Sequence, residues 1–223
     1  MSGFLDRTAA GKALADELAD RGYDDPVVLA LPRGGVPVGI ELVRALHAPM
    51  DLVMVRKIGV PAQPELAAGA IVNGDDPQTV VNEEVLAHAG LSRDEVDRLG
   101  RAQLDEIRRR RQTYLRDRRP VPVKGRTAIV VDDGIATGAT MRASLRAVRR
   151  RRPAWLVLAV PVAPPETCEA LRKEVDEAIC LLTPSFFGAI GAYYSDFGQT
   201  SDDEVIALMD EAARIASGGT GNG

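Results

Sequence analysis

The sequence predicts an α/β fold with a mainly parallel sheet flanked by helices. Short apolar runs of strand length alternate along the chain with segments of helical periodicity. This alternation is typical of parallel strands joined by crossover helices, which then cover both faces of the sheet. A chain of 223 residues suits one large domain, which is expected over residues 1–216. The glycine-rich residues 217–223 are expected to form a disordered tail.

Five apolar runs are expected to form the core sheet. They are short, rich in aliphatic residues and bounded by proline, glycine or charged residues. These runs are residues 27–31, 51–55, 127–131, 155–160 and 178–182. Ligands bind outside the carboxyl ends of the strands in such sheets, so the residues that follow each run are the first candidates for a site.

Helices are expected between the runs, each with its own start or stop signal. Asp6 or Thr8 can cap the first helix, which stops near Gly22. Ser201 and Glu204 can cap the last helix. The other helices of the core are residues 36–46, a segment that carries Met141, Leu145 and Val148 and ends at Pro153, and residues 165–175.

An insertion is expected between the second and third core strands. Residues 67–81 read as a β-hairpin with a turn at 73–77. Residues 82–119 then read as one or two helices, and Ser92 with Glu95 fits a capping box at the start of the second. That second helix is mostly charged, so it is either solvated or packed along a narrow apolar stripe. The helical insertion is expected to act as a lid or as an oligomer contact.

Composition excludes several classes of protein. The formal net charge of −4 gives no global attraction to nucleic acid or to an anionic membrane. No apolar run reaches the roughly 18 residues that span a bilayer. The first residues lack the apolar core of a signal peptide, so a cytoplasmic protein is expected. Cys168 and Cys180 have no metal-site or redox spacing and are expected to be small buried residues in a reducing compartment.

Residues 129–140 (IVVDDGIATGAT) carry the strongest chemical signal in the chain. Asp132 and Asp133 end an apolar run, Gly134 lets the chain turn, and small residues and hydroxyls then open a helix. Such a helix start exposes backbone N–H groups where the dipole favours an anion. Paired carboxylates repel a phosphate but suit hydroxyl groups, so the residues predict a sugar-phosphate site. The simpler alternative is a capped helix preceded by two solvated acids.

This segment resembles the signature of type I phosphoribosyltransferases, which bind 5-phosphoribosyl 1-diphosphate (PRPP). Both have several apolar residues, two acids, two variable residues, a small residue and then T-G-x-T. The resemblance implies that Asp132 and Asp133 face the ribose 2- and 3-hydroxyls and can hold Mg²⁺ through water. It also implies a loop around the 5-phosphate, made of Gly134, Ala136, Thr137, Gly138, Ala139 and Thr140.

A second segment, residues 31–35 (LPRGG), matches the loop that holds the diphosphate in this family. Arg33 offers a forked donor for phosphate oxygens, and Gly34 and Gly35 allow a close backbone approach. The family often has a non-proline cis peptide here, which is expected between Arg33 and Gly34. Arg56 and Lys57, just past the second core strand, are further candidates for pyrophosphate contacts. A plain turn and simple surface charges are the alternatives.

Aromatic residues gather in residues 183–200, which are expected to form a small C-terminal hood. In purine-specific relatives an aromatic after the last core strand stacks on the base. Phe187 is the best candidate for that role, ahead of Phe186. Packing of a small subdomain or of a dimer contact is an equally weighted alternative.

The resemblance implies a reaction as well as a fold. The 5-phosphoribosyl group would pass from PRPP to a nitrogen nucleophile, such as a nucleobase, with release of pyrophosphate and with Mg²⁺ as cofactor. Asp132, Asp133, Arg33 and Lys57 are the expected catalytic residues, in a cytoplasmic homodimer that serves nucleotide salvage. Ala136 stands where hypoxanthine-guanine relatives have an aspartate, which disfavours that subclass and leaves the general base unidentified.

The alternative function is that of a PRPP-sensing regulatory protein with little or no turnover. Arginine-rich runs at residues 108–111, 116–119 and 149–152 would then supply a nucleic-acid surface. These runs lie among acids on expected helices, so a solvated face is favoured and nucleic-acid binding is not expected. The chain has no G-x-S-x-G or P-loop motif, which argues against a serine hydrolase and a P-loop nucleotidase.

Overall fold

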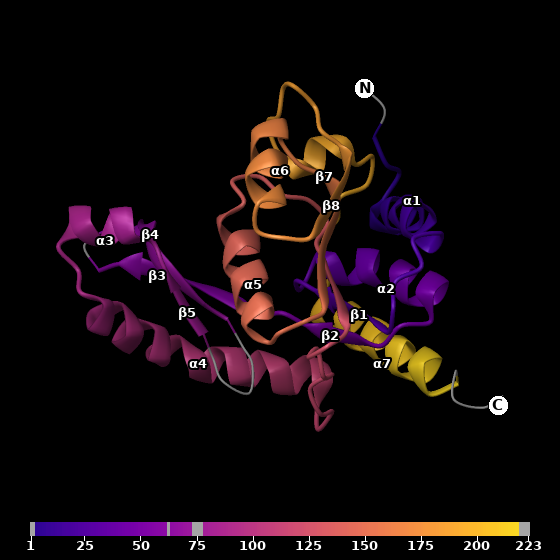
Figure 1. Cartoon of the computed structure of the whole chain (residues 1–223), viewed down its shortest axis with the longest axis horizontal. Helices are drawn as coiled ribbons and strands as arrows, with labels where there is room; N and C mark the ends of the chain where they lie inside the picture. Colours follow the sequence, from indigo (N-terminus) through magenta and orange to yellow (C-terminus); the bar gives the residue numbers. More distant parts are fainter. Residues whose placement is uncertain (1–2, 62, 73–77, 219–223) are drawn as a thin grey trace.

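A computed structural model describes residues 3–61, 63–72 and 78–218 of the chain, and its core is a five-stranded parallel sheet (Figure 1). The strand order is β2-β1-β6-β7-β8. The strands are β1 (Pro26–Ala30), β2 (Met50–Leu52), β6 (Thr127–Val131), β7 (Trp155–Val162) and β8 (Glu177–Leu182). The predicted α/β class, with a mainly parallel sheet flanked by helices, is therefore confirmed.

Helices cover both faces of this sheet (Figure 1). In β6, Ile129 and Val131 belong to the apolar cluster that includes residues of α1, α2 and α7, whereas Ala128 and Val130 belong to the cluster of α5 and α6. Side chains of a strand alternate between the two faces, so burial of both faces requires an unbroken apolar run. The helices are α1 (Arg7–Ala19), α2 (Gly35–Leu46), α5 (Ala139–Arg150), α6 (Pro165–Arg172) and α7 (Asp202–Gly218).

An arm extends away from the core sheet between β2 and β6 (Figure 1). Its antiparallel sheet has the order β3-β4-β5, with β3 (Val55–Val60), β4 (Gln63–Val72) and β5 (Gln78–Val81). The predicted hairpin is confirmed as β4 and β5, and its turn at 73–77 lies outside the described residues. The second core strand was expected over residues 51–55, but it ends at Leu52, and Val55 begins the arm.

Two helices complete the arm, α3 (Glu83–Ala89) and α4 (Arg93–Leu115). Ser92 and Glu95 form the predicted capping box at the start of α4. Only a few α4 residues are buried, among them Val96, Ile107 and Tyr114, spaced so that they form one narrow stripe. This stripe packs on β3 and β4 and on α7, so the long charged helix bridges the arm and the core.

The ends of two helices, α6 and α7, differ from the expectation. Helix α6 ends at Arg172 rather than at residue 175. Helix α7 continues to Gly218, so Ser217 and Gly218 are helical rather than part of a disordered tail, and residues 219–223 lie outside the described residues. The side chain of Ser201 accepts a hydrogen bond from the Glu204 N–H, as its expected role in capping requires.

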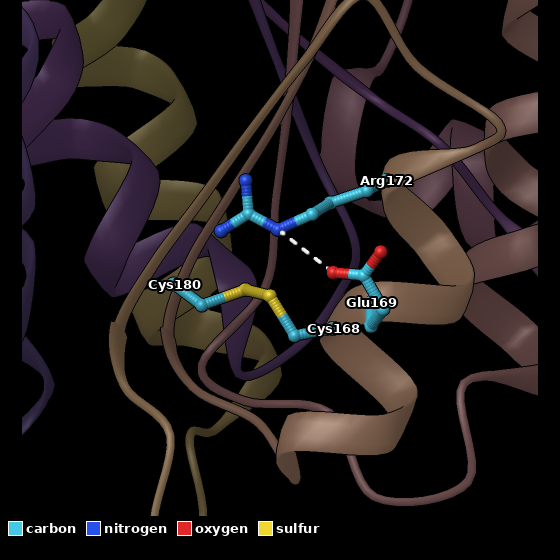
Figure 2. The surroundings of a disulfide bond; sticks show 4 residues. All are labelled: Cys168, Glu169, Arg172 and Cys180. Carbon is cyan, nitrogen blue, oxygen red and sulfur yellow. Dashed lines mark ion pairs between the residues drawn. A yellow bond between two sulfur atoms is a disulfide. The ribbon is translucent and has the colours of Figure 1, made fainter.

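The two cysteines form a disulfide between α6 and β8, which corrects the expectation of reduced thiols (Figure 2). The Cα atoms of Cys168 and Cys180 lie 6.9 Å apart. Their separation of 12 residues corresponds to no metal or redox motif, so nothing local in the sequence indicated the pairing.

Among the described residues, no helix is both long enough and apolar enough to cross a membrane.

Candidate functional site

The register of the core sheet brings the two singled-out loops together. Ala30, the last residue of β1, is paired with Val131, the last residue of β6. The Leu31 N–H donates to the Val131 carbonyl at 3.0 Å. Residues 31–35 and 132–140 therefore start side by side at the carboxyl edge of the sheet, which is where ligands bind in this class of fold.

Gly34 and Gly35 allow the first loop to lie directly against the paired acids. A Cβ atom at Gly34 would overlap the Asp133 carboxylate, and one at Gly35 would lie 2.7 Å from the Val131 carbonyl oxygen and 3.0 Å from the Asp132 Cα. No other residue type fits these two positions without a shift of these neighbouring atoms. The cis peptide of this loop joins Pro32 and Arg33, so its expected place between Arg33 and Gly34 was wrong by one bond.

Arg7 makes the two carboxylates different from each other. Its Nε donates to Asp133 Oδ2 at 2.8 Å, its Nη1 donates to the Gly198 carbonyl at 2.7 Å, and its guanidinium lies 3.9 Å from the centre of the Phe197 ring. The side chains of Arg7 and Asp133 are 13% and 12% exposed, so solvent screens this ion pair little. Asp133 thus has a cation as partner, whereas Asp132 Oδ1 accepts a backbone N–H bond from Asp133.

Burial of the Asp132 carboxyl group, and then the charge of Asp133, raise the pKa of Asp132 well above its usual value. The nearby Arg7 lowers this pKa and so opposes the shift. The ionised state of Asp132 is therefore sensitive to what happens to its neighbours, as is common for groups in functional sites.

Residues 136–140 form an open turn at the N-terminus of α5. Ala136, Thr137, Ala139 and Thr140 are exposed, and Gly138 has a positive φ of 76°. The Thr167 hydroxyl of α6 donates to the Ala136 carbonyl at 3.0 Å and so ties the turn to α6. The first backbone N–H groups of a helix have no partner within that helix, and the dipole is positive there, so this turn can hold an anion.

Within the described part of the chain, the Arg33 side chain forms no hydrogen bond or ion pair with Asp132 or Asp133. Its Nη1 lies 3.4 Å from Asp202 Oδ1, at the start of α7. Arg56 and Lys57 were expected beside the core sheet, but they lie on β3 in the arm, and Arg56 pairs with Glu106 of α4 at 2.8 Å. The structure therefore brings Gly34 and Gly35 against the paired acids, leaves the Arg33 side chain at Asp202, and places Arg56 and Lys57 in a different sheet.

The aromatic residues after β8 form a packed hood over the loop. Phe187 stacks on Tyr193 with ring centres 5.5 Å apart, whereas Phe186 is 82% exposed. Packing of a small subdomain is thus observed for Phe187, and its role in base stacking stays a prediction. The Tyr194 hydroxyl donates to the Asp133 carbonyl at 2.5 Å, which ties the hood to the acids.

The N-terminal segment is part of this hood. Phe4 forms a parallel bridge with Tyr194, and its carbonyl accepts from the Ser195 N–H at 2.9 Å. This pairing directs Arg7 onto Asp133. No local pattern in the sequence marks Arg7, Tyr194 or Thr167 as parts of the site, since each acts on residues far away in the chain.

Comparisons with known proteins place the chain in a family. The chain matches the family model described as "Phosphoribosyl transferase domain" over residues 5–197, and it therefore belongs to that family. It is 46% identical over 211 residues to proteins of two Mycobacterium tuberculosis strains, CDC 1551 / Oshkosh and ATCC 25618 / H37Rv, both provisionally named phosphoribosyl transferase. These matches cover 95% of this chain and 47% of each relative, so the chain spans about half the length of the curated relatives it matches.

A solved structure resembles the whole chain. The crystal structure of TT1426 from Thermus thermophilus has a TM-score of 0.83 and 43% sequence identity, covering 95% of this chain and 99% of that chain. The arm and the hood are thus included in the similarity, which extends beyond the core sheet.

Proposed function

We propose that this chain transfers the 5-phosphoribosyl group of PRPP to a nitrogen nucleophile, such as a nucleobase, and releases pyrophosphate. The observation that carries the proposal is the contact of Gly34 and Gly35 with Asp133 and Asp132. It supports the proposal because residues 31–35, the two carboxylates and the start of α5 lie at one sheet edge, where they would serve as diphosphate loop, ribose contact and 5-phosphate site. These are the three parts that a ribose with a diphosphate and a 5-phosphate needs.

Each part has a distinct role in the proposed reaction. The start of α5 holds the 5-phosphate through backbone N–H groups of residues 136–140. Asp132 accepts hydrogen bonds from the ribose hydroxyls and favours the positive charge that develops on the ring as the bond to pyrophosphate breaks. Asp133, held by Arg7, fixes the position of Asp132 through its backbone N–H. Backbone groups of Gly34 and Gly35 approach the leaving diphosphate.

Magnesium fits this site through Asp132 rather than through both acids. Asp133 has a guanidinium within 2.8 Å, which disfavours a second cation on the same oxygen. Magnesium usually takes one or two carboxylates together with substrate oxygens and water. When bound, it would neutralise charge on the departing diphosphate. A homodimer in the cytoplasm that salvages nucleobases is the proposed setting.

Isothermal titration with PRPP in the presence of Mg²⁺ tests the binding part of the proposal. Asp132→Asn is expected to weaken binding at least about tenfold, because it replaces a charged acceptor of the hydroxyls. Asp16→Asn, at an exposed position of α1, is the matched control and should bind normally. Equal affinity for PRPP in both variants would contradict the site.

Pyrophosphate release with a panel of nucleobases tests the catalytic part. We expect release with at least one base and none without a base. Tight PRPP binding without release for any base would instead favour the sensing function, which shares this site but has no turnover.

A further inference from the structure

A second, basic cavity lies beside the diphosphate loop, between α4 of the arm and the start of α7. Its volume is about 110 Å³. This is far below the roughly 300–1,000 Å³ of pockets for larger ligands, so only a small group fits. It is lined by Arg33, Arg109, Arg110, Thr113, Tyr114 and Asp202.

The cavity carries an excess of positive charge. Three guanidinium groups line it, against the single carboxylate of Asp202. Asp202 is already engaged, since its Oδ1 accepts a hydrogen bond from the buried Tyr114 hydroxyl at 2.6 Å and lies 3.4 Å from Arg33 Nη1. Because Asp202 is the single lining carboxylate and is shared between Tyr114 and Arg33, the positive charge of the arginines is not fully balanced, and the cavity favours an anion.

Glu106 holds the two α4 arginines in position from outside the cavity. It accepts from Arg109 Nε at 2.8 Å and from Arg110 Nε at 3.0 Å, and it also pairs with Arg56. Its hydrogen bond with Arg109, supported by those with Arg110 and Arg56, lowers the pKa of Glu106 to about 2. Glu106 is therefore ionised at any physiological pH. A guanidinium has five N–H donors, so these bonds leave Arg110 with donors to spare.

Arg33 connects this cavity to the site already described. Its backbone follows the cis peptide after Pro32, and the next two residues lie against Asp133 and Asp132. An anion in the cavity would therefore lie close to a ligand bound at the paired acids. The 3.4 Å contact with Asp202 is long for a charge-assisted hydrogen bond, so a stronger acceptor can draw Arg33 away from it.

We infer that this cavity is a binding site for a phosphoryl group, held by Arg33 together with Arg109 and Arg110 of α4. The two N–H groups on one side of a guanidinium can bind two oxygens of the same phosphate. The guanidiniums of Arg109 and Arg110 are already held by Glu106 before a ligand binds. The arm thereby takes part in ligand binding. The phosphoryl group is either the end of the PRPP diphosphate, an identification that rests on the function proposed above, or part of a separate phosphorylated molecule.

Isothermal titration of the full chain with inorganic pyrophosphate, without PRPP, tests the cavity through two double variants that differ in whether the arginines they replace line it. Arg109→Gln combined with Arg110→Gln is expected to weaken binding at least about tenfold, because charge-assisted hydrogen bonds are lost. The matched control is Arg101→Gln combined with Arg108→Gln, which removes the same charge from exposed α4 positions outside the cavity. The control pair should bind pyrophosphate as the unchanged chain does.

Equal affinity of the two double variants, or no pyrophosphate binding by the unchanged chain, would overturn the inference. Neither outcome affects the proposed function, which depends on the response of PRPP binding to Asp132→Asn. Titration of pyrophosphate into chain saturated with PRPP then separates the two sources. Competition identifies the substrate diphosphate, and additive binding that still requires Arg109 and Arg110 identifies a separate phosphorylated molecule.

Discussion

Arg7 and Asp133 form an ion pair that lies mostly out of solvent, beside a second carboxylate whose pKa is raised. Asp133 therefore has a guanidinium as partner, whereas the Asp132 carboxylate accepts a backbone N–H bond. The charge on Asp132 then depends on a residue at the start of the chain. This arrangement explains how two adjacent acids can coexist where both are largely buried, since one of them is neutralised by a cation.

Arg7→Gln is expected to reduce PRPP affinity more at low pH than at high pH. Arg7 lowers the pKa of Asp132, so its removal raises that pKa further. A protonated Asp132 is a weaker acceptor, so the affinity of the variant falls at a higher pH than that of the unchanged chain. Titrations across pH 5 to 8 measure this shift. Lys12→Gln, on the exposed side of α1, is the control, and parallel pH profiles for the two variants would argue against the coupling.

Gly34→Ala is expected to abolish PRPP binding while the chain still folds. The added Cβ would overlap the Asp133 carboxylate, so the Asp133 side chain must move, and with it the ion pair with Arg7. Gly188→Ala is the control, because nothing lies within 4 Å of a Cβ at that position. Circular dichroism checks folding and titration calorimetry checks binding. Normal PRPP affinity in Gly34→Ala would contradict the close approach of the two loops.

At the scale of elements, the disulfide joins α6 to the edge strand β8. It closes a short loop of chain, for which loop entropy predicts about 2–3 kcal/mol of stabilisation. Reduction by dithiothreitol is therefore expected to lower the free energy of unfolding by about this amount. Urea unfolding with and without reductant measures it. Cys168→Ala combined with Cys180→Ala should be insensitive to reductant.

Thiol titration of the untreated chain is the direct check on the bond. No reactive thiol is expected in the urea-unfolded, unreduced chain, and two are expected after reduction. Two reactive thiols before reduction would contradict the disulfide and support the reduced cysteines expected from the sequence.

The core elements were predictable because their signals are local. Continuous apolar runs indicated the buried strands, and Asp6, Ser92 and Ser201 marked helix starts where the structure has them. Strand β3 was not predictable in the same way. Its sequence, VRKIGV, carries two charged residues near its start. It pairs with β4 in the sheet of the arm, which is separate from the core sheet. Val55 was therefore assigned to the second core strand, whereas it begins β3 of the arm, and the contacts of Arg56 and Lys57 with pyrophosphate stay a prediction.

The paired acids and the glycine loop were predictable for a related reason, since each is a contiguous motif at the end of a strand. The contacts that modify them were not. Arg7 reaches Asp133 across 126 residues, and Tyr114 reaches Asp202 across 88 residues. Such pairs arise from the three-dimensional arrangement of elements, and a single sequence carries no periodic or spacing signal for them.

For the whole molecule, the arginines of the first arginine-rich run, residues 108–111, are each paired with an acid. In the first run, Arg108 pairs with Asp105, Arg109 and Arg110 pair with Glu106, and Arg111 pairs with the buried Asp51. Nucleic-acid binding depends on a row of cations with enough net charge to neutralise successive phosphates, and the acids beside these arginines reduce the net charge of the run. The overall charge of −4 opposes such binding further.

No binding of duplex DNA is therefore expected at physiological ionic strength, about 0.15 M. Fluorescence anisotropy with a labelled duplex, repeated at low salt, measures this. Submicromolar binding that weakens steeply with salt would contradict the expectation and would support a nucleic-acid-binding regulator. An RNA duplex of equal length serves as the comparison.

The hood pairing of the N-terminal segment has a consequence for how the chain folds during synthesis. Arg7 leaves the ribosome 191 residues before its partner Gly198. Strand β1 likewise pairs with β6, which is synthesised only after the whole arm. Contacts of such long range are slow to form, because the loop between them must close first. A nascent chain that ends before the hood thus holds Asp133 without the complete set of contacts that fixes Arg7, and the ion pair between them is fully supported only after the hood has been synthesised.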